Sequence, residues 1–246
     1  MSQSFEPVFR SANGYYLELG PNQEGRDFVI GDIHGEHEKL QELLAKARIQ
    51  LGSDRIFFAG DLVDRGPKPF QVLGMLRKPG VFSVLGNHDV WCIEGGLIGE
   101  PAGHYKYGGK WFYELRDVER KAVAAFLIQL PYALSFIGPD GKRYGLVHAD
   151  CPSYRWDYFK ETLCGEWGAS MMDKAITEAI WSRTRFEDRD TNIVRGVEKV
   201  FVGHNVTDEV TELGNVVHLD TGGCFEGRRL SMLELKPDGG WVVHQA

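Results

Sequence analysis

The sequence predicts an α/β fold in which short buried strands alternate with amphipathic helices. Three apolar runs, at residues 28–30, 56–59 and 81–85, each end at a glycine, as buried strands followed by tight turns do. Apolar residues at helical spacing follow the first two runs. Strands joined through helices run parallel, so we expect a largely parallel sheet with these strand ends at one edge, where ligands collect.

The first 80 residues supply the elements of this pattern. Residues 1–26 alternate weakly between apolar and polar types and end in a Gly-Pro-Asn turn signal, which predicts an edge hairpin or an extended lead-in. Apolar positions within 40–47 recur at helical spacing, and a second helix is expected to begin near Pro67.

The rest of the chain is read in two parts. Residues 90–130 look helical and irregular, with glycine pairs at 95–96 and 108–109, and we expect a cap beside the site whose aromatic residues form packed core. Beyond Pro131 the pattern becomes rich in strands. The expected elements are strands at 132–137, 144–147, 200–202, 209–213, 216–219 and 230–235, with a helix around 171–181.

Size and composition restrict the functional class. With 246 residues the chain can bury one sizeable core, so we expect a single domain over 1–246 with about 90–130 as its cap. A net charge of −7 argues against nucleic acid as the main partner. No apolar stretch approaches the roughly 18 residues that cross a bilayer, and the N-terminus lacks the form of an export signal. Four cysteines without C-x-x-C spacing indicate reduced thiols, which favours a cytoplasmic location without membrane attachment.

Residues that can bind metal ions stand directly after the predicted strands. They occur in Gly31-Asp32-Ile33-His34-Gly35, Gly60-Asp61-Leu62-Val63-Asp64-Arg65-Gly66, Gly86-Asn87-His88-Asp89, at His148 and in Gly203-His204. Asp32 and His34 are two apart on what should be an extended segment, so both side chains should point to one side. Mixed carboxylate and imidazole ligands suit zinc, manganese or iron better than calcium. Five strand ends that converge predict a site for two cations, which together can clamp the attacking and leaving oxygens of a phosphoester.

These motifs resemble those of the calcineurin-like metallophosphoesterase superfamily, and the 60–66 segment resembles its phosphoprotein phosphatase branch. Three further segments look most like the bacterial and phage-lambda-type serine/threonine protein phosphatases. They are His148-Ala149-Asp150 with Pro152, Trp181-Ser182-Arg183, and Leu219-Asp220-Thr221-Gly222-Gly223. The resemblance runs from about residue 27 to about 235. It implies a central mixed β-sandwich flanked by helices, in four layers α/β/β/α.

The resemblance also implies a role for each motif residue. Two divalent metal ions would be held, the first by Asp32, His34 and Asp61, and the second by Asp61 as a bridge with Asn87, His148 and His204. Manganese is expected, with iron, zinc or nickel as alternatives. A metal-bridging water would attack phosphorus directly and in line.

The remaining implied roles concern the phosphate and the leaving group. His88, oriented by Asp64, would protonate the leaving oxygen. Arg65 and Arg183, with Asn87, would bind the phosphate, since a guanidinium matches phosphate geometry.

Competing structural interpretations exist for several of these residues. Arg65 could form a salt bridge with Asp64 or Asp61, and Arg183 could be a solvated residue at a helix end. Asp150 could support His148 or cap a turn. The remaining histidines match no motif and are interpreted as non-ligands: His37, His104, His218 and His244.

Three positions depart from the protein phosphatase pattern. Leu85 stands where those enzymes carry arginine, Asp89 where they carry glutamate, and Asn205 where they carry threonine. The 84–89 segment is instead similar to the symmetrical diadenosine tetraphosphate hydrolases. The favoured function is a serine/threonine protein phosphatase acting on phosphorylated proteins. The alternatives are hydrolysis of dinucleoside polyphosphates or another small phosphoester, and a non-catalytic metal-binding regulatory module. The sequence does not predict an oligomeric state.

Overall fold

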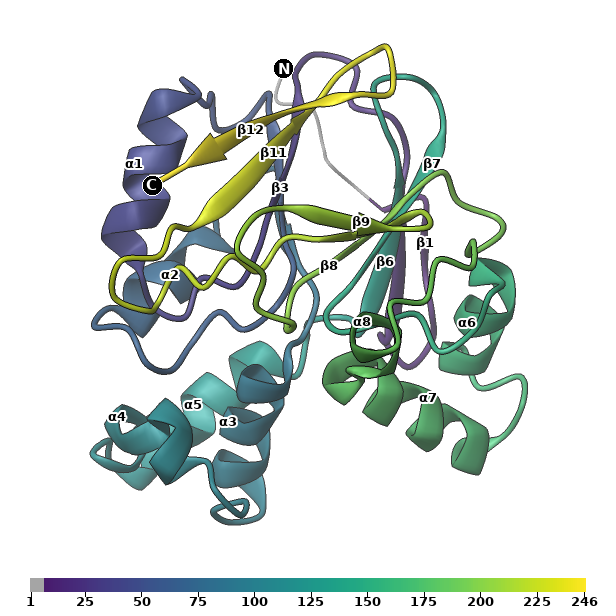
Figure 1. Cartoon of the computed structure of the whole chain (residues 1–246). Coiled ribbons are helices and arrows are strands. Elements are labelled where there is room, and N and C mark those ends of the chain that lie inside the picture. The colour runs from purple at the N-terminus through teal and green to yellow at the C-terminus, as the bar shows by residue number, and fades with distance from the viewer. Residues whose placement is uncertain (1–6) are drawn as a thin grey trace.

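The computed structural model describes residues 7–246, so the first part of the expected lead-in and of the export-signal region, residues 1–6, lies outside the described residues. The strands form two sheets (Figure 1). The five-stranded sheet has the order β12(Trp241–Gln245), β11(Ser231–Leu235), β3(Asp27–Ile30), β4(Arg55–Phe58), β5(Val81–Ser83). The seven-stranded sheet has the order β1(Phe9–Arg10), β2(Tyr16–Leu19), β6(Ala133–Ile137), β7(Arg143–Val147), β8(Val200–Val202), β10(Val216–His218), β9(Thr211–Leu213).

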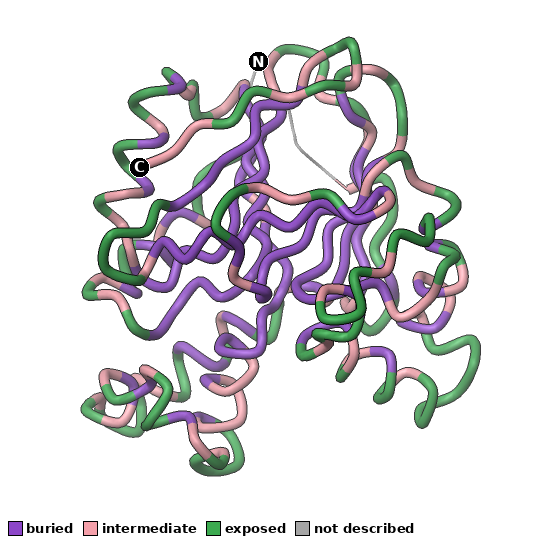
Figure 2. The backbone as a smooth tube through the Cα atoms, in the orientation of Figure 1, coloured by how far each residue is buried: buried purple, intermediate pink, exposed green. Residues whose placement is uncertain are grey.

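The two sheets face one another through alternate residues of their strands. Val29 of β3 and Phe201 of β8 belong to the core cluster between the sheets. Phe28 and Ile30, on the other side of β3, belong to a cluster on the outer face. Figure 2 shows most strands buried along their length, which is why they read as continuous apolar runs in the sequence.

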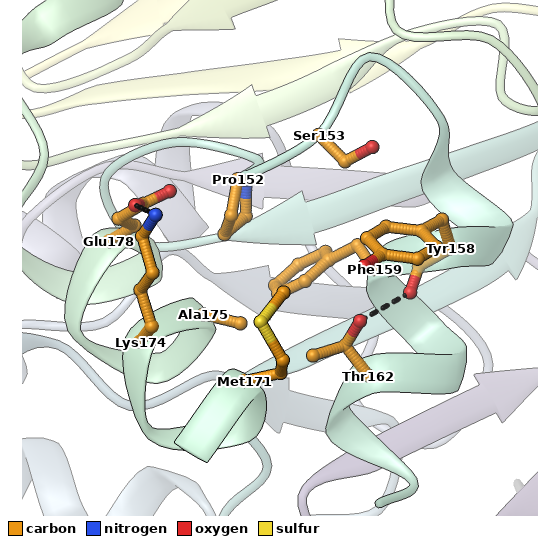
Figure 3. Close-up of a pocket in the computed structure, with 9 residues that line it drawn as sticks. All are labelled: Pro152, Ser153, Tyr158, Phe159, Thr162, Met171, Lys174, Ala175 and Glu178. Carbon is orange, nitrogen blue, oxygen red and sulfur yellow. Dashed lines mark hydrogen bonds and ion pairs between the residues drawn. The ribbon is translucent and has the colours of Figure 1, made fainter. Parts of the chain in front are cut away.

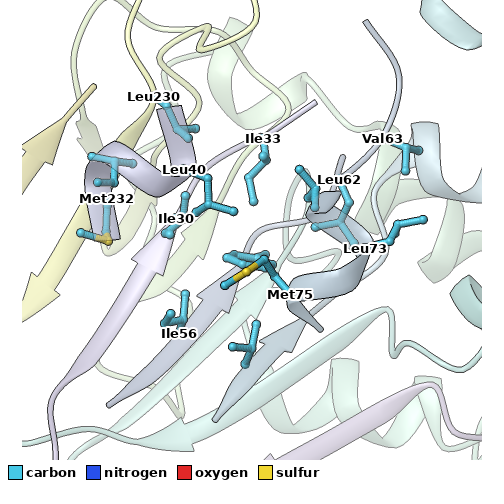
Figure 4. Packing of buried hydrophobic residues seen from close by; sticks show 14 of the residues in the cluster. Ile30, Ile33, Leu40, Ile56, Leu62, Val63, Leu73, Met75, Leu230 and Met232 are labelled. Carbon is cyan, nitrogen blue, oxygen red and sulfur yellow. The ribbon is translucent and has the colours of Figure 1, made fainter. Parts of the chain in front are cut away.

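Helices cover the outer face of each sheet. α1(His37–Lys46) and α2(Pro69–Met75) pack on the five-stranded sheet, where Leu40 and Leu73 join Ile30 in one cluster (Figure 4). α6(Trp156–Leu163) and α7(Ala169–Trp181) cover the seven-stranded sheet. Burying one large apolar side chain fully, instead of leaving it exposed to water, stabilises the folded state by about 1.5–3 kcal/mol. The predicted four-layer α/β/β/α arrangement is confirmed.

The central strands align their ends at one edge of the sandwich. Strands β3, β4 and β5 run parallel, and the register places Ile30 beside Phe58 and Phe58 beside Ser83. Strands β7 and β8 are also parallel. The loops that follow these strands therefore leave at common edges, as expected from the strand-end motifs.

The expectation of a largely parallel sheet holds only for these central strands. β11 pairs antiparallel with both β3 and β12, and β6 pairs antiparallel with β7. The β6–β7 and β11–β12 connections are short turns that reverse the chain, whereas parallel neighbours need a long crossover. Both sheets are consequently mixed.

Helices α3(Asn87–Leu97), α4(Lys110–Tyr113) and α5(Asp117–Leu127), with the π-helical turn η1(Tyr105–Gly109), project beyond the sandwich in Figure 1. The glycine pair at 95–96 does not break the helix, contrary to expectation. A Cβ on Gly96 would lie 2.7 Å from the Cβ of Ala124, so this glycine lets α3 and α5 pack closely. Asn87 and His88 lie in the first turn of α3 rather than in a loop.

Other predicted elements occur with ends shifted by one or two residues. β1, β12, α6 and α8(Thr184–Glu187) are additional elements that the sequence did not predict separately. The lead-in forms an antiparallel β1–β2 pair at the edge of the seven-stranded sheet, which agrees with the hairpin alternative. Within residues 7–246, no helix combines the length and the apolar character required to cross a membrane.

Candidate active site

Asp61 lies between two histidines from different strand ends. Its Oδ2 is 3.4 Å from His34 Nε2, and its Oδ1 is 3.4 Å from His148 Nε2. Asp61, His148 and His204 form one buried group, in which the possible ligand atoms lie within 4.8 Å of one another. Asp61 also forms a second buried group of this kind with His34 and His88. The two groups share Asp61, which is the arrangement of a carboxylate bridging two cations.

The histidine rings are held so that Nε2 faces this cluster. Nδ1 of His34 is 2.8 Å from the carbonyl oxygen of Val63, and Nδ1 of His148 is 2.7 Å from that of Ala59. A carbonyl oxygen can only accept, so in the neutral form of each ring Nδ1 carries the proton and Nε2 keeps its lone pair. These rings therefore present the atom that binds metal.

His204 shows the same readiness to bind a cation. Its Nε2 is buried and has no hydrogen-bond partner among residues 7–246. Burial lowers the pKa of His34 and of His204 to about 3, so both rings are neutral at pH 7. Neutral imidazole is the form that coordinates metal, so the buried rings fit that role.

Three buried carboxylates lie close together at this site: Asp32, Asp61 and Asp220. Asp32 accepts the His204 N–H at 3.2 and 3.1 Å through its two oxygens, and the charge of Asp220 acts on it. Burial, with the charges of Asp220 and Asp61, raises the pKa of Asp32. Burial also acts to raise the pKa of Asp61, but the histidines around it, His148 first, lower that pKa below its usual range. Buried anions at this density need compensating positive charge, which divalent cations supply.

Asn87 completes the donor set. Its Oδ1 is 3.0 Å from His148 Nε2, so two lone-pair-bearing atoms face each other. A shared cation is the partner that satisfies both atoms. Five of the six predicted ligands thus lie together, whereas Asp32 lines the same cavity as Asp61 but belongs to neither group of close ligand atoms. The structure also adds Asp220, whose segment had carried part of the resemblance without being singled out as a site residue.

His88 and Asp64 form the predicted pair. His88 Nδ1 is 2.6 Å from Asp64 Oδ2, and both side chains are buried. Asp64 also contacts His104 and Trp111, two residues that sequence reasoning had not connected with the site. The glycine pair at 108–109, which lets their segment approach, was the signal that could have revealed them.

Both predicted arginines reach the site. Arg65 donates from Nη1 to His34 Nε2 at 2.9 Å and from Nη2 to His88 Nε2 at 3.1 Å. Within residues 7–246 no ion pair joins Arg65 to Asp61 or Asp64, so the competing salt-bridge interpretation is wrong. Arg183 is exposed, and its Nη1 donates to Asn205 Oδ1 at 3.0 Å.

One cavity of about 430 Å³ collects these groups. Its walls include seven of the ten predicted residues: Asp32, Asp61, Arg65, Asn87, His88, Arg183 and His204. His34, Asp64 and His148 lie behind the wall. Trp91 and Tyr107 also line the cavity, so the expectation that the cap aromatics are packed core is wrong for these two. Their rings are stacked with centroids 6.1 Å apart.

A second, smaller cavity of about 70 Å³ lies between α6 and α7 (Figure 3). Phe159 and Met171 form its apolar part, and the side chains of Lys174 and Glu178 pair at 3.7 Å on its rim. No residue predicted for the site lines it. The chemistry-bearing groups are therefore concentrated in the larger cavity.

The backbone of the site is strained. His34, Asp61, Asp64, Arg65 and His204 all have φ between 45° and 69°. His34 is therefore not on an extended segment, as had been expected. Its N–H donates to Asp61 O at 2.8 Å and its carbonyl accepts from Gly66 N–H at 2.8 Å, so hydrogen bonds between two loops impose the turn. Such strain clusters at functional sites.

The departures from the phosphatase pattern have structural roles. Asp89 accepts the N–H groups of Leu62 at 3.0 Å and Gly86 at 2.9 Å, so its shorter side chain ties the Asp61 loop to the start of α3. Leu85 is buried in the core cluster of the outer face. Asp150 pairs with Arg185 rather than supporting His148 directly.

One protein family matches most of this chain. The model of the calcineurin-like phosphoesterase family matches residues 28–226. The chain belongs to this family. The protein is thus a phosphoesterase, and the family together with the residue clusters indicates a binuclear site for divalent cations.

Individual relatives divide between two substrate classes. Serine/threonine-protein phosphatase 2 of Escherichia coli (strain K12) is 29% identical over 227 residues, which is 90% of this chain and 98% of the relative. The symmetrical bis(5'-nucleosyl)-tetraphosphatase of Dechloromonas aromatica (strain RCB) is 42% identical over 85 residues, covering 34% of this chain and 29% of the relative. A crystal structure described as that of a candidate diadenosine tetraphosphatase has a TM-score of 0.66 at 24% identity, covering 97% of this chain and 99% of its own, and supports the fold alone.

Proposed function

We propose that the protein is a metal-dependent phosphomonoester hydrolase that acts on serine/threonine phosphoproteins. The observation that carries this proposal is the 430 Å³ cavity, in which metal-binding side chains, two arginines and His88 converge. Residues 1–246 would act as one domain, with about 90–130 as the cap beside the cavity.

The metal ions would be divided between two sets of ligands. Asp32, His34 and Asp61 would hold one divalent cation, and Asn87, His148 and His204 would hold the other, with Asp61 shared. Bound cations supply Lewis acidity and activate water at neutral pH. Manganese is proposed, with iron, zinc or nickel as alternatives.

The chain's own residues would manage the phosphate and the proton. Arg65 and Arg183 would bind the phosphate oxygens through paired N–H donors, because each guanidinium reaches the cavity. His88, held by Asp64, would deliver a proton to the leaving oxygen. The attack would be direct, so neither a serine nor a cysteine nucleophile is required.

The preference for phosphoproteins rests on how much of this chain aligns with each class of relative. The protein phosphatase relative aligns with nearly all of this chain, whereas the tetraphosphatase relative aligns with a third of it. Leu85 and Asp89 favour the second candidate function, cleavage of dinucleoside polyphosphates, since they lie in the segment that resembles those enzymes.

A substrate comparison tests the proposal. Protein loaded with Mn²⁺ should hydrolyse a phosphoserine peptide with higher kcat/KM than diadenosine tetraphosphate, and elemental analysis should find two metal ions per chain. Asp61→Asn should lose both metal and activity. Asp208→Asn should lose neither, because that side chain is 96% exposed and serves as the matched control. A large preference for the dinucleotide would establish the second candidate instead, and the absence of any hydrolysis would favour a regulatory module.

A further inference from the structure

Asp64 is held by three side-chain donors. His88 Nδ1 lies 2.6 Å from Oδ2, His104 Nε2 lies 3.0 Å from the same oxygen, and Trp111 Nε1 lies 2.8 Å from Oδ1. Asp64 and His104 are fully buried. One donor comes from the first turn of α3, and the other two come from the segment around η1 and α4.

The direction of these hydrogen bonds follows from the Asp64 carboxylate, which can only accept, so His104 carries its proton on Nε2 and its Nδ1 accepts from Tyr113. The Tyr113 hydroxyl is 2.8 Å from His104 Nδ1, and burial raises the pKa of Tyr113 above its usual value, so the hydroxyl keeps the proton that it donates. Tyr113, His104, Asp64 and His88 therefore form a continuous hydrogen-bonded chain, of which only Tyr113 is partly exposed.

Asp64 remains a carboxylate within this chain. Burial acts to raise the pKa of Asp64, but the hydrogen bonds from His104 and His88 outweigh it and lower that pKa. His88 Nδ1 therefore donates to Asp64, which leaves Nε2 as the ring atom on the cavity side. The carboxylate can stabilise the imidazole ring while it carries the extra proton of a general acid.

The glycine pair at 108–109 makes the contact possible. A Cβ on Gly109 would lie 2.3 Å from Cδ2 and 2.4 Å from Nε2 of His104. A Cβ on Gly108 would lie 2.8 Å from the backbone nitrogen of Arg65, whose N–H donates to the Gly108 carbonyl at 3.3 Å. The backbone of this segment consequently lies directly against both Arg65 and His104.

We propose that His104 and Trp111 are positioning residues for the proton transfer performed by His88. With Trp111 on one oxygen and two histidines on the other, the Asp64 carboxylate cannot rotate, so the direction of His88 Nε2 is fixed. When Arg65 Nη2, which lies 3.1 Å from His88 Nε2, donates to the phosphate instead, that nitrogen is free to carry a proton. As the P–O bond breaks, this proton passes to the ester oxygen, and the ring is left neutral with Nδ1–H on Asp64. His104 and Trp111 exchange no proton. This inference rests on the proposed function.

A cation is the rival occupant of this position. Asp64, Cys92 and His104 place ligand atoms within 4.8 Å of one another. However, the Trp111 and His104 N–H groups already point at Asp64, and burial raises the pKa of Cys92, which keeps it a neutral thiol. Donors facing the carboxylate repel a cation, so the geometry favours the hydrogen-bonded chain.

Leaving-group dependence tests the proposal. His104→Phe and Trp111→Phe should lower kcat for alkyl phosphates by about 10–100-fold, the usual effect of removing an outer-shell partner. The loss should be much smaller for nitrophenyl phosphate, because a good leaving group needs little protonation. His104→Gln should recover part of the activity through its amide donor. Trp167→Phe, which alters an exposed tryptophan, is the matched control and should match the wild type on both substrates.

Gly109→Ala provides a variant that removes no donor. The added methyl group should displace the His104 ring and reproduce the selective loss on alkyl phosphates. Circular dichroism and thermal unfolding confirm that each variant is folded. Equal losses on alkyl and aryl phosphates in all folded variants would overturn the positioning role while leaving the proposed function intact.

Nitrogen-15 NMR of the imidazole rings gives a readout that does not depend on turnover. His104 should be protonated on Nε2 and His88 on Nδ1, and Tyr113→Phe should shift the His104 signals, whereas Tyr105→Phe should not. The opposite tautomer of His104 would overturn the proposal even if the enzyme is active. If His104→Phe bound one metal ion fewer than the wild type, a cation held by Asp64, Cys92 and His104 would be established, and the proposal would be overturned. If wild-type protein hydrolyses no ester, the proposed function fails, and with it the assigned proton transfer.

Discussion

Arg185 and Asp150 form a buried ion pair that joins the short helix α8 to the loop after β7. Arg185 Nε donates to Asp150 Oδ1 at 2.9 Å, and Arg185 Nη1 donates to the carbonyl oxygen of Asn192 at 3.0 Å. Asp150 lies two residues after His148, and Arg185 lies two residues after Arg183. The pair therefore connects a candidate metal ligand with a candidate phosphate-binding residue.

Arg185→Met should destabilise the protein and weaken activity. The substitution leaves the Asp150 carboxylate buried without its partner, which costs about 3–5 kcal/mol of the free energy of unfolding. Urea unfolding measures the loss, and kcat/KM on a phosphoserine peptide should fall because α8 and the loop after β7 are no longer held together. The double variant Asp150→Asn/Arg185→Met should regain part of the stability. Arg195→Met alters an exposed arginine and serves as the control. A stability equal to wild type would contradict the assigned role of the pair.

Asn205→Ala should weaken phosphate binding. Asn205 Oδ1 accepts a hydrogen bond from Arg183 Nη1, and its Nδ2 donates to the Ser182 carbonyl oxygen at 3.3 Å, so the amide holds the loop that carries Arg183. A hydrogen bond to a charged group contributes about 1.5–3 kcal/mol, so we expect about a tenfold or greater rise in KM and in the inhibition constant of inorganic phosphate. Asn192→Ala, at an exposed asparagine, should change neither constant. Unchanged phosphate inhibition in Asn205→Ala would show that Arg183 is held by other groups.

Gly203→Ala should damage the metal centre without removing a ligand. A Cβ at this position would lie 1.9 Å from Asp32 Oδ1, so the carboxylate must move. A displacement of about 1 Å at a catalytic group costs on the order of 100-fold in rate. Elemental analysis should show reduced metal content together with the lower kcat. Gly74→Ala, where an added Cβ meets nothing within 4 Å, should keep full activity and gain about 0.5–1 kcal/mol of stability as a helix substitution. Full metal content in Gly203→Ala would mean that Asp32 does not hold metal.

The central residues of the site could be predicted because each directly follows a predicted strand. Asp32, Asp61 and His204 each follow a short apolar run, and parallel pairing brings such ends together. Local sequence pattern carries this information, since both the apolar run and the glycine after it are visible without the fold. The same reasoning failed for His34, whose left-handed backbone is imposed by hydrogen bonds to residues about 30 positions away.

Residues that act through tertiary contacts were not predictable in the same way. His104 stands in an irregular segment with no motif, and only the folded chain places it against Asp64, 40 positions earlier. Arg185 lies two residues after the recognised Trp181-Ser182-Arg183 segment, and its partner Asp150 is 35 positions away. Trp91 and Tyr107 read as core because aromatic residues usually pack inside, whereas the cavity exposes part of them. Long-range packing decided each case, and a single sequence carries no record of it.

Arg55→Met should lower stability in a pH-dependent manner while leaving the activity of folded molecules unchanged. Arg55 pairs with Asp27 through Nε–Oδ1 at 2.7 Å and Nη2–Oδ2 at 2.8 Å, and both residues are buried where β3 and β4 begin, whereas the site follows the other ends of these strands. Removing one partner of such a pair costs about 3–5 kcal/mol.

The pH dependence follows from the Asp27 carboxyl. Burial raises the pKa of Asp27 above its ordinary value even beside Arg55, and loss of the guanidinium raises it further. A carboxyl with a higher pKa in the folded state favours folding below its unfolded pKa, and this stabilisation is lost as pH rises through the folded pKa. The stability difference between wild type and Arg55→Met should therefore grow with rising pH and shrink on acidification. Urea unfolding between about pH 5 and pH 8 measures this difference, with Arg195→Met as control. A difference that is constant with pH would show that Asp27 does not remain a buried, unpaired carboxyl in the variant.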